Sequence, residues 1–265
     1  MPELPDVTYF KHYIDRVALH KKISAVQCED ERVLKNTNCE GLNRILKGEK
    51  FTGTKRRGKF LIINLANSGK MLILHFGMTG NISCRESEAK TEDEKKYSQL
   101  IIEFHDGSRF FWINKRLLGS VHLVDKVDEV ATIKEMGPDA LELSECLFLK
   151  LLSEHERKNI KAFLMDQSNI AGLGNEYSNE LLFQADINPH RKIRDLSKSE
   201  RRKIYKVMRD MFEEAIEIGV PVNPFPGGWL LAHLDDMTCP KDVKHNLKKE
   251  TIAGRSAIYC PIHQA

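Results

Sequence analysis

The feature that most constrains the fold is a change in the period of the apolar residues near the middle of the chain. Up to about residue 130 the apolar residues come in short runs such as FLIINL and MLILHF, which Gly and charged residues separate. From about residue 144 they recur at helical spacing. Short apolar runs bounded by turn signals predict strands, whereas a period of 3.6 predicts helices. We therefore expect an α+β protein with a strand-rich first half and a helical second half.

The first half is predicted to be a mainly antiparallel β domain that follows a leading helix. The helix is expected over residues 5–19, where apolar residues recur at helical spacing: Val7, Phe10, Ile14 and Val17. Strands are expected in FTGTKRRGKFLIINLA, KMLILHFGMTG, QLIIEFHDGSRFFWI and GSVHLV, with Asp106-Gly107 as a hairpin turn. The charged stretch at residues 85–96 is expected to be a solvated loop between two strands.

The second half is predicted to be helical. Helical spacing covers SECLFLKLL, IKAFLMDQ and NEYSNELLF, and a longer helix begins at a Ser197/Glu200 capping box and ends at Gly219. The stretch before these helices contains Gly137-Pro138, which suits a hinge. We expect a β domain at residues 1–130, a hinge at 131–150, a helical domain at 151–220, and a linker with a terminal hairpin at 221–265.

Charge and hydropathy narrow the location and the partners. The 265 residues have a net charge of +3, so affinity for a polyanion has to come from local clusters of Lys and Arg. The chain has neither an apolar run of about 18 residues nor a secretory leader. We therefore expect an intracellular protein without a membrane span. Four isolated cysteines are read as thiols in a reducing compartment: Cys28, Cys39, Cys84 and Cys146.

The C-terminal segment contains a pattern of metal ligands. They form two pairs that each begin with Cys-Pro: Cys239 with His245, and Cys260 with His263. Soft ligands paired at short spacing suit a tetrahedral structural zinc ion holding a short β-hairpin. Two buried thiols beside two surface histidines are the alternative. A regular C-x2-C spacing would put the second ligand at Asp242, so His245 has the better ligand type and Asp242 the more regular position.

Three segments suit contact with phosphates. Two glycines precede Asn175 at a helix start, where backbone N–H groups and a side-chain amide favour an anion, although such glycines also serve any tight interhelical turn. The run KRRGKFL at residues 55–61 places four cations beside a sheet edge, where strands also carry charge for solubility. Arg255 in the expected hairpin can grip a phosphate or remain an ordinary exposed arginine.

Two turns carry apolar side chains. Met78 lies between glycines in HFGMTG, and INKRLLG ends a strand with Arg116 and Leu118 two residues apart. Apolar side chains at loop tips serve as wedges that unstack DNA, whereas Met78 taken alone also suits packing in a core or loop. The basic run at residues 190–203 is read as a solvated helix entry.

Taken together, the ordered motifs resemble the formamidopyrimidine-DNA glycosylase and endonuclease VIII family over essentially the whole chain. The matching stretches are PELPDV, RRGKFL, HFGMTG, NKRLLG, DQSNIAGLGNEYSNE and IAGRSAIYCPIHQ. The resemblance implies an N-terminal antiparallel β-sandwich, a helix-two-turn-helix bundle and a zinc-finger β-hairpin with one structural zinc ion. It also implies a monomeric base-excision-repair enzyme that acts on double-stranded DNA with an oxidised base or abasic site, in the cytoplasm or at a nucleoid.

The resemblance implies roles for individual residues. After removal of Met1, Pro2 is the nucleophile and Glu3 its proton donor and acceptor. Phosphates around the damaged nucleotide are held by Lys59, His75, Asn175 and Arg255, and Lys59 also counts among the catalytic residues. Glu180 supports the helix-two-turn-helix element. The gap left by the flipped nucleotide is filled by Met78, Arg116 and Leu118, with Arg116 facing the orphaned base.

This chemistry depends on a free terminal amine. An α-amino group titrates near roughly 7.7 to 8.0, against about 10.4 for lysine, so a free Pro2 keeps a neutral fraction that can attack sugar C1′. The attack displaces the damaged base and gives a Schiff base, and β- or β,δ-elimination then cuts the strand while Glu3 moves protons. No cofactor is required for these steps, so zinc is expected to be structural.

Three departures from the family pattern leave choices open. Leu118 stands where the family often has an aromatic, the second zinc cysteine is absent, and residues 220–238 lack the Gly-Lys-Pro-Gly stretch and the loop that caps 8-oxoguanine in many relatives. The preferred lesion therefore stays open. The competing interpretation is a non-catalytic damaged-DNA binding protein of the same fold. A zinc-hairpin transcription factor would leave the N-terminal sequence unexplained.

Overall fold

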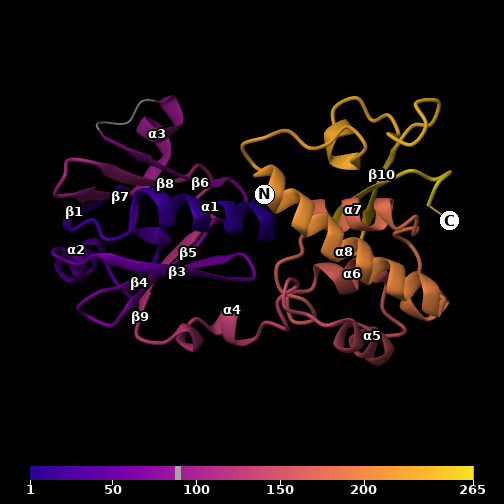
Figure 1. The fold of residues 1–265 in the computed structure, drawn as a ribbon, viewed down its shortest axis with the longest axis horizontal. Coiled ribbons are helices and arrows are strands. Elements are labelled where there is room, and N and C mark those ends of the chain that lie inside the picture. The colour runs from indigo at the N-terminus through magenta and orange to yellow at the C-terminus, as the bar shows by residue number, and fades with distance from the viewer. Residues whose placement is uncertain (87–90, 265) are drawn as a thin grey trace. The chain divides into compact units, whose positions relative to one another are not determined.

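The backbone divides into a strand-rich unit and a helical unit. The structure is a computed structural model and describes residues 1–86 and 91–264 (Figure 1). Unit 1 holds Met1–Pro2 and Asp6–Glu135, and unit 2 holds Glu3–Pro5 and the chain from Met136 onward. This arrangement confirms the predicted α+β class. The finer domain limits predicted from the sequence stay a prediction.

Unit 1 contains two β-sheets. The four-stranded sheet has the order β1-β7-β8-β6 and is antiparallel, with strands β1 (Ile23–Cys28), β6 (Gly80–Arg85), β7 (Ser98–Phe104) and β8 (Arg109–Asn114). The five-stranded sheet has the order β2-β9-β5-β4-β3. Its strands are β2 (Leu34–Lys35), β3 (Phe51–Arg57), β4 (Phe60–Leu65), β5 (Met71–His75) and β9 (Ser120–Val124). β2 pairs with β9 in parallel, and the other neighbours in this sheet are antiparallel.

Helix α1 (Leu4–Val17) and both sheets share one hydrophobic core. Val7, Phe10 and Ile14 are buried in that core because they recur on one face of the helix. The rings of Phe10 and Phe76 lie 4.6 Å apart. Two sheets that bury residues in a common core are the layers of a sandwich. The predicted leading helix is therefore confirmed, with its first turn at Leu4.

The turn and loop predictions for unit 1 have different outcomes. Gly107 has a φ of 84° in the β7–β8 turn, which confirms the hairpin turn predicted there. The loop prediction is wrong over residues 92–96, because Thr91 and Glu94 form a capping box that begins helix α3 (Glu92–Tyr97). Residues 87–90 of that prediction lie outside the described residues. The other short elements are α2 (Cys39–Leu46), α4 (Ala131–Lys134), η1 (Glu31–Val33) and η2 (Val127–Glu129).

Unit 2 is built from helices around a second core and ends in a hairpin. Its elements are α5 (Glu145–Glu154), α6 (Ile160–Met165), α7 (Asn175–Gln184), α8 (Lys198–Ile218), η3 (Ile193–Asp195), η4 (Leu230–His233), β10 (Lys248–Ile252) and β11 (Arg255–Tyr259). The Ser197/Glu200 capping box and Gly219, with a φ of 81°, confirm both predicted ends of α8. The antiparallel β10–β11 pair confirms the terminal hairpin.

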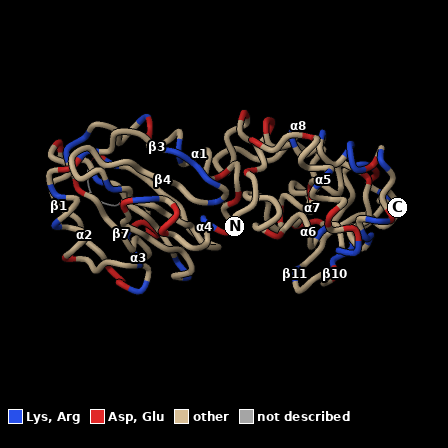
Figure 2. The backbone as a smooth tube through the Cα atoms, turned by 90° about the horizontal axis from the view of Figure 1, so that it is seen from below, with Lys and Arg blue, Asp and Glu red and all other residues tan. Residues whose placement is uncertain are grey.

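Charged residues of both signs are distributed along the whole chain. Figure 2 shows Lys and Arg interspersed with Asp and Glu in both units, as expected from 41 basic and 38 acidic residues. Across the described residues, none of the helices combines the length and apolar character that a membrane-spanning helix requires.

Candidate functional site

The carboxylate of Glu3 is buried at the start of helix α7. It accepts hydrogen bonds from the backbone N–H groups of Gly174, at 2.6 Å, and Glu176, at 3.0 Å. The side chain is fully buried. The N–H groups at a helix start carry partial positive charge, so they stabilise a carboxylate. We predicted that the N–H groups at this helix start bind a phosphate. Two of them instead donate to the carboxylate of Glu3.

Glycine allows this approach of the N-terminal segment. Leu4 donates its backbone N–H to the carbonyl of Gly172 at 3.2 Å. Gly172 has a φ of 111°, and a Cβ there would lie 2.6 Å from the Leu4 side chain. A larger residue at 172 would therefore displace the segment that carries Glu3. Pro2 directly precedes Glu3 and is partly exposed.

A buried lysine that sequence analysis missed lies under the same helix start. The Nζ atom of Lys161 donates to Asn179 Oδ1 at 2.6 Å, to Ser178 Oγ at 3.0 Å and to the Asn175 carbonyl at 3.3 Å. Burial lowers the pKa of Lys161 to about 7, although the negative charge of Glu3 opposes the shift. In the sequence this lysine looks like an ordinary polar position of a short helix, so no local signal marks it.

Asn175 and the hairpin residue Arg255 are brought together. Asn175 donates through Nδ2 to the hydroxyl of Ser256 at 3.2 Å, and Ser256 directly follows Arg255. The hairpin turns at Ala253 and Gly254, both with positive φ, as a two-residue type I′ turn requires. The exposed Arg255 side chain begins strand β11 at this turn. The two predicted phosphate ligands of unit 2 are therefore neighbours.

Glu180 connects helix α7 to the segment before the hairpin. Its fully buried carboxylate accepts hydrogen bonds from the Leu231 N–H and from Gln184 Nε2, both at 2.8 Å. Burial raises the pKa of Glu180 to about 7, against the effect of these hydrogen bonds. Glu180 therefore anchors the start of η4 instead of facing solvent.

In unit 1, Lys59 and His75 lie at the adjoining ends of strands β4 and β5. Gly58, with a φ of 55°, and Lys59 form the two-residue turn between Arg57 and Phe60, and Gly in the first position is typical of a type II′ turn. Phe60 pairs with His75 across the strands, and their rings lie 4.6 Å apart. Burial lowers the pKa of His75 to about 4, and the charge on Lys59 adds to the shift. His75 is therefore neutral beside a cation.

Met78, Arg116 and Leu118 lie on two touching loops of unit 1. The Arg116 guanidinium lies 3.4 Å from the Met78 sulfur, and the Arg116 N–H donates to Thr79 Oγ1 at 3.2 Å. A Cβ on Gly77 would lie 2.5 Å from the backbone of Leu118. Met78 is 44% and Leu118 51% exposed, which is high for apolar side chains. The structure therefore brings the three predicted gap-filling residues together.

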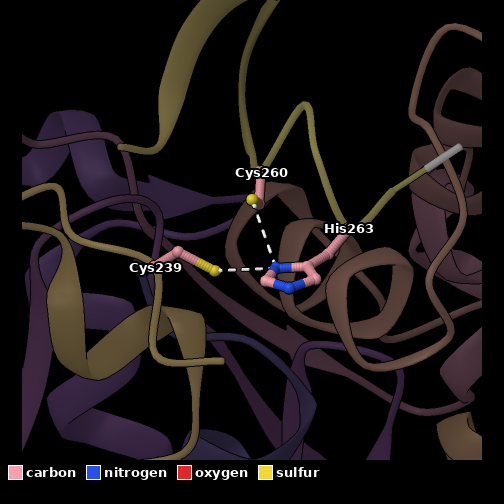
Figure 3. Close-up of side chains that lie close together, drawn as sticks. All are labelled: Cys239, Cys260 and His263. Carbon is pink, nitrogen blue, oxygen red and sulfur yellow. Dashed lines mark hydrogen bonds between the residues drawn. The ribbon is translucent and has the colours of Figure 1, made fainter. Parts of the chain in front are cut away.

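Three of the four predicted metal ligands converge beside the hairpin (Figure 3). His263 Nδ1 lies 3.2 Å from Cys239 Sγ and 3.4 Å from Cys260 Sγ, and both cysteines are buried. Zinc bonds of about 2.0 to 2.3 Å in tetrahedral geometry put ligand atoms roughly 3.5 Å apart. The Cys239–Cys260–His263 cluster can therefore hold a metal ion.

The fourth position has two candidates on one turn. The centroids of the His245 and His263 rings lie 5.0 Å apart. His245 Nδ1 is buried without a hydrogen-bond partner among the described residues. Asp242 instead accepts the Lys244 N–H at 3.0 Å and lies 3.8 Å from His245 Nε2. An orphaned imidazole nitrogen beside the cluster fits a fourth ligand better than a carboxylate that already has a partner.

Comparisons with known proteins give the family. Residues 1–121 match the model of the formamidopyrimidine-DNA glycosylase N-terminal domain, and residues 136–223 match the H2TH domain of the same enzymes. Together the two models cover most of the chain. The chain belongs to the formamidopyrimidine-DNA glycosylase family.

Individual relatives match over nearly their full length. The formamidopyrimidine-DNA glycosylase of Mycoplasma genitalium is 31% identical over 98% of this chain and 94% of its own. That of Pelotomaculum thermopropionicum is 31% identical over 100% and 99%. A Lactococcus lactis formamidopyrimidine-DNA glycosylase non-covalently bound to DNA with an abasic site has a TM-score of 0.83, 26% identity and 99% coverage of both chains. A structure of MutM with DNA containing carbocyclic 8-oxoguanine has a TM-score of 0.85, 27% identity and 100% coverage of both.

Proposed function

We propose that the chain is a bifunctional DNA glycosylase and abasic-site lyase that removes oxidised bases from duplex DNA. The observation that carries the proposal is the Glu3 carboxylate, which α7 holds at a fixed place one residue after Pro2. The relatives add support because their structures contain DNA with an abasic site or an oxidised guanine analogue. Because the proposed substrate is DNA, we expect the enzyme where the cell keeps its DNA. A single chain supplies every residue that the proposal uses.

Pro2 acts once Met1 has been removed and its nitrogen is a secondary amine. The amine attacks C1′ of the damaged nucleotide, the base leaves with the bond electrons and a proton, and the sugar ring opens to an iminium ion. The iminium acidifies C2′, so loss of that proton expels the 3′ phosphate, and a second elimination expels the 5′ phosphate. Glu3 carries the protons, and one N–H donor on each of its oxygens fixes its orientation.

The remaining polar residues hold the DNA backbone in this proposal. Lys59 and the neutral His75 contact phosphates from unit 1, and Asn175 and Arg255 from unit 2. Lys59 also counts as catalytic in this proposal, because a positive charge stabilises a phosphate as it leaves. Glu180 holds α7 and the following segment in place. Met78, Arg116 and Leu118 enter the stack when the damaged nucleotide leaves it, which offsets an unstacking cost of a few kcal/mol.

A zinc ion held by Cys239, Cys260, His263 and His245 completes the proposal. When bound, it cross-links the turn at residues 239–245 to the end of β11 and so supplies structure, not chemistry. The short sulfur-to-nitrogen distances and the orphaned Nδ1 of His245 support this ligand set. The finer domain roles also belong to the proposal: catalysis at residues 1–130, a hinge at 131–150, and DNA binding by 151–220 and the terminal hairpin.

Borohydride trapping tests the catalytic proposal. Reduction of the iminium should link the wild-type protein covalently to duplex DNA with an abasic site. Pro2→Gly and Glu3→Gln should still bind that DNA but lose strand cleavage. In Glu3→Gln one carboxylate acceptor becomes an NH2 group, which opposes a backbone donor. A fully active Pro2→Ser variant would sink the mechanism, and absence of any adduct on damaged duplexes would favour the non-catalytic binding protein.

A further inference from the structure

Residues 239–245 form a closed turn, the cysteine turn, which a lysine attaches to the end of helix α7. The backbone N–H of Cys239 donates to the His245 carbonyl at 2.9 Å, which closes the turn. Within it, Lys241 Nζ donates to the Phe183 carbonyl at 3.2 Å and lies 4.8 Å from the centre of the Phe183 ring. Phe183 is in the last turn of α7, where backbone carbonyls carry partial negative charge. The ammonium group of Lys241 is therefore well placed to hold the turn on the helix.

Asp186 strengthens this attachment. It follows α7 with a φ of 60°, at a position that glycine usually occupies. Its carboxylate forms an ion pair with Lys241. The same carboxylate accepts a hydrogen bond from Lys203 of α8 at 2.7 Å. Asp186 thus connects the cysteine turn to two helices.

The same face of α7 contacts the hairpin. Asn175 Nδ2 donates to the Ser256 hydroxyl at 3.2 Å, and Asn179 Oδ1 accepts the Ile258 N–H at 3.3 Å. Asn175, Asn179 and Phe183 recur every four residues, so they lie on one face of the helix. The hairpin and the cysteine turn are therefore attached to one side of α7 by contacts that need no metal ion.

The turn that carries Cys260 is held by a more deeply buried group. Gln264 is 1% exposed, accepts the Cys260 N–H at 2.8 Å and donates to the Ile187 carbonyl at 2.8 Å. The Lys241 side chain is 30% exposed, so water and salt weaken its ion pair. The cysteine turn is thus the side of the metal cluster that can separate more easily.

We propose that Lys241 and Asp186 are positioning residues that hold the cysteine turn on α7 and so determine how long a zinc ion stays bound. The proposal rests on the zinc ligands of the function proposed above, and it concerns residues that do not bind the metal. A ligand that is held in place before binding loses less conformational entropy and moves away from the metal less often. Groups that orient metal ligands commonly change the metal affinity by about 10- to 100-fold. Because Lys241 is partly exposed, we expect a smaller effect.

Zinc release to the coloured chelator pyridylazoresorcinol tests this on the full chain without DNA. Lys241→Met removes the ammonium group but keeps a long unbranched side chain, and it should release zinc about 5-fold faster than the wild type. Lys241→Arg keeps a cation at the helix end and should stay within about 2-fold of the wild type. The matched control is Lys244→Met, the same charge change at an exposed position of the cysteine turn, which should not alter the rate. Equal rates for Lys241→Met and Lys244→Met would overturn the proposal.

A double variant tests whether Asp186 acts through Lys241. Asparagine tolerates the left-handed backbone of position 186, so Asp186→Asn removes the charge without backbone strain. We expect Asp186→Asn to speed zinc release about 3-fold by itself and to add nothing to Lys241→Met, because residues that share one contact are not additive. Independent effects of the two substitutions would contradict a shared attachment.

The outcomes separate this proposal from the proposed catalysis. Faster release from Lys241→Met in a protein that forms no borohydride adduct would support the attachment and refute the catalysis. A wild type that forms the adduct but contains no zinc would overturn the attachment. If Lys241→Met fails to fold, Asp186→Asn decides the question, and a release rate equal to that of the wild type would overturn the proposal.

Discussion

The two units hold their proposed DNA contacts by different physical means. In unit 1, the half-buried Lys59 and the exposed Met78 and Leu118 lie on tight turns whose backbone is fixed by glycines and strand pairing. In unit 2, the contacts depend on a buried polar layer that includes Glu3, Lys161 and Glu180, all fully buried. Exposed side chains on a rigid backbone can change with little effect on folding. Buried polar groups cannot, because each one leaves a partner unsatisfied.

This difference predicts where function and stability are coupled. Substitutions at the exposed residues of unit 1 should alter activity alone, whereas substitutions of Lys161 and Glu180 in unit 2 should also change the free energy of unfolding. The following predictions test this contrast, beginning with the largest expected effect.

Loss of the metal should have the largest effect. Cys260→Ser removes a buried member of the Cys239–Cys260–His263 cluster, so the hairpin with Arg255 should lose its anchor and the affinity for abasic duplex should fall by about 10- to 100-fold. Metal analysis should find about one zinc per wild-type chain and much less in the variant. Cys146→Ser, at an exposed cysteine, is the control. Full zinc content and affinity in Cys260→Ser would exclude the proposed site.

Lys161→Met should destabilise the protein by about 2–4 kcal/mol. The substitution leaves Asn179 and Ser178 without their buried donor and removes a positive charge that interacts with the Glu3 carboxylate. Urea unfolding at neutral pH measures the loss in the free energy of unfolding. Lys150→Met, on the exposed side of α5, should change it by less than about 0.5 kcal/mol. Equal effects of both substitutions would contradict the buried layer.

Glu180 should make unit 2 less stable as the pH rises. Its pKa is about 7 in the folded protein against 4.5 for an ordinary glutamate carboxyl, so the folded state binds the extra proton. The contribution of Glu180 to the free energy of unfolding is fully present below pH 4.5. It is lost as the pH rises towards 7, by on the order of 2–3 kcal/mol. The free energy of unfolding of Glu180→Gln minus that of the wild type should therefore rise across this window. A difference independent of pH would contradict the assignment.

His75 should give the opposite slope in unit 1. Its pKa is about 4 when folded against 6.5 for an ordinary imidazole, so the unfolded state binds more protons between these values. The contribution of His75 to the free energy of unfolding is present above pH 6.5 and is lost as the pH falls towards 4. The loss is on the order of 2 kcal/mol, because the ring is only partly buried. His75→Gln should remove this loss. If the stabilities of Glu180→Gln and His75→Gln, each relative to the wild type, changed with pH in the same direction, the contrast between the units would be contradicted.

The structure shows what kind of information a single sequence contains. Helices α1, α7 and α8 and the hairpin at Gly254 follow from local spacing, caps and turn residues, so they could be predicted. Thr91 and Glu94 provide a capping signal for helix α3. The helix was nevertheless missed, because the many charged residues of this stretch were taken to indicate a solvated loop.

The candidate site divides in the same way. The exposed residues of the site lie in short sequence motifs, so they could be named from the sequence. Their roles stay proposals. Lys161 and the contact between Glu3 and Gly174, 171 residues apart in the chain, depend on tertiary packing. No local pattern reports that a lysine is buried or which helix start receives a carboxylate.

Leu118→Phe should have the smallest effect and tests unit 1 alone. Leu118 is 51% exposed, so a larger side chain meets no packed neighbours and the free energy of unfolding should change by less than about 0.5 kcal/mol. An aromatic ring stacks on a base better than leucine does, so base excision should increase by about 2- to 5-fold while cleavage of abasic duplex stays constant. Leu74→Phe, in the core of unit 1, is the control and should destabilise by about 1–3 kcal/mol. If Leu118→Phe lowered stability as Leu74→Phe does, the loop would be packed and not poised in solvent. If it lowered excision, the wedge would be limited by fit and not by stacking.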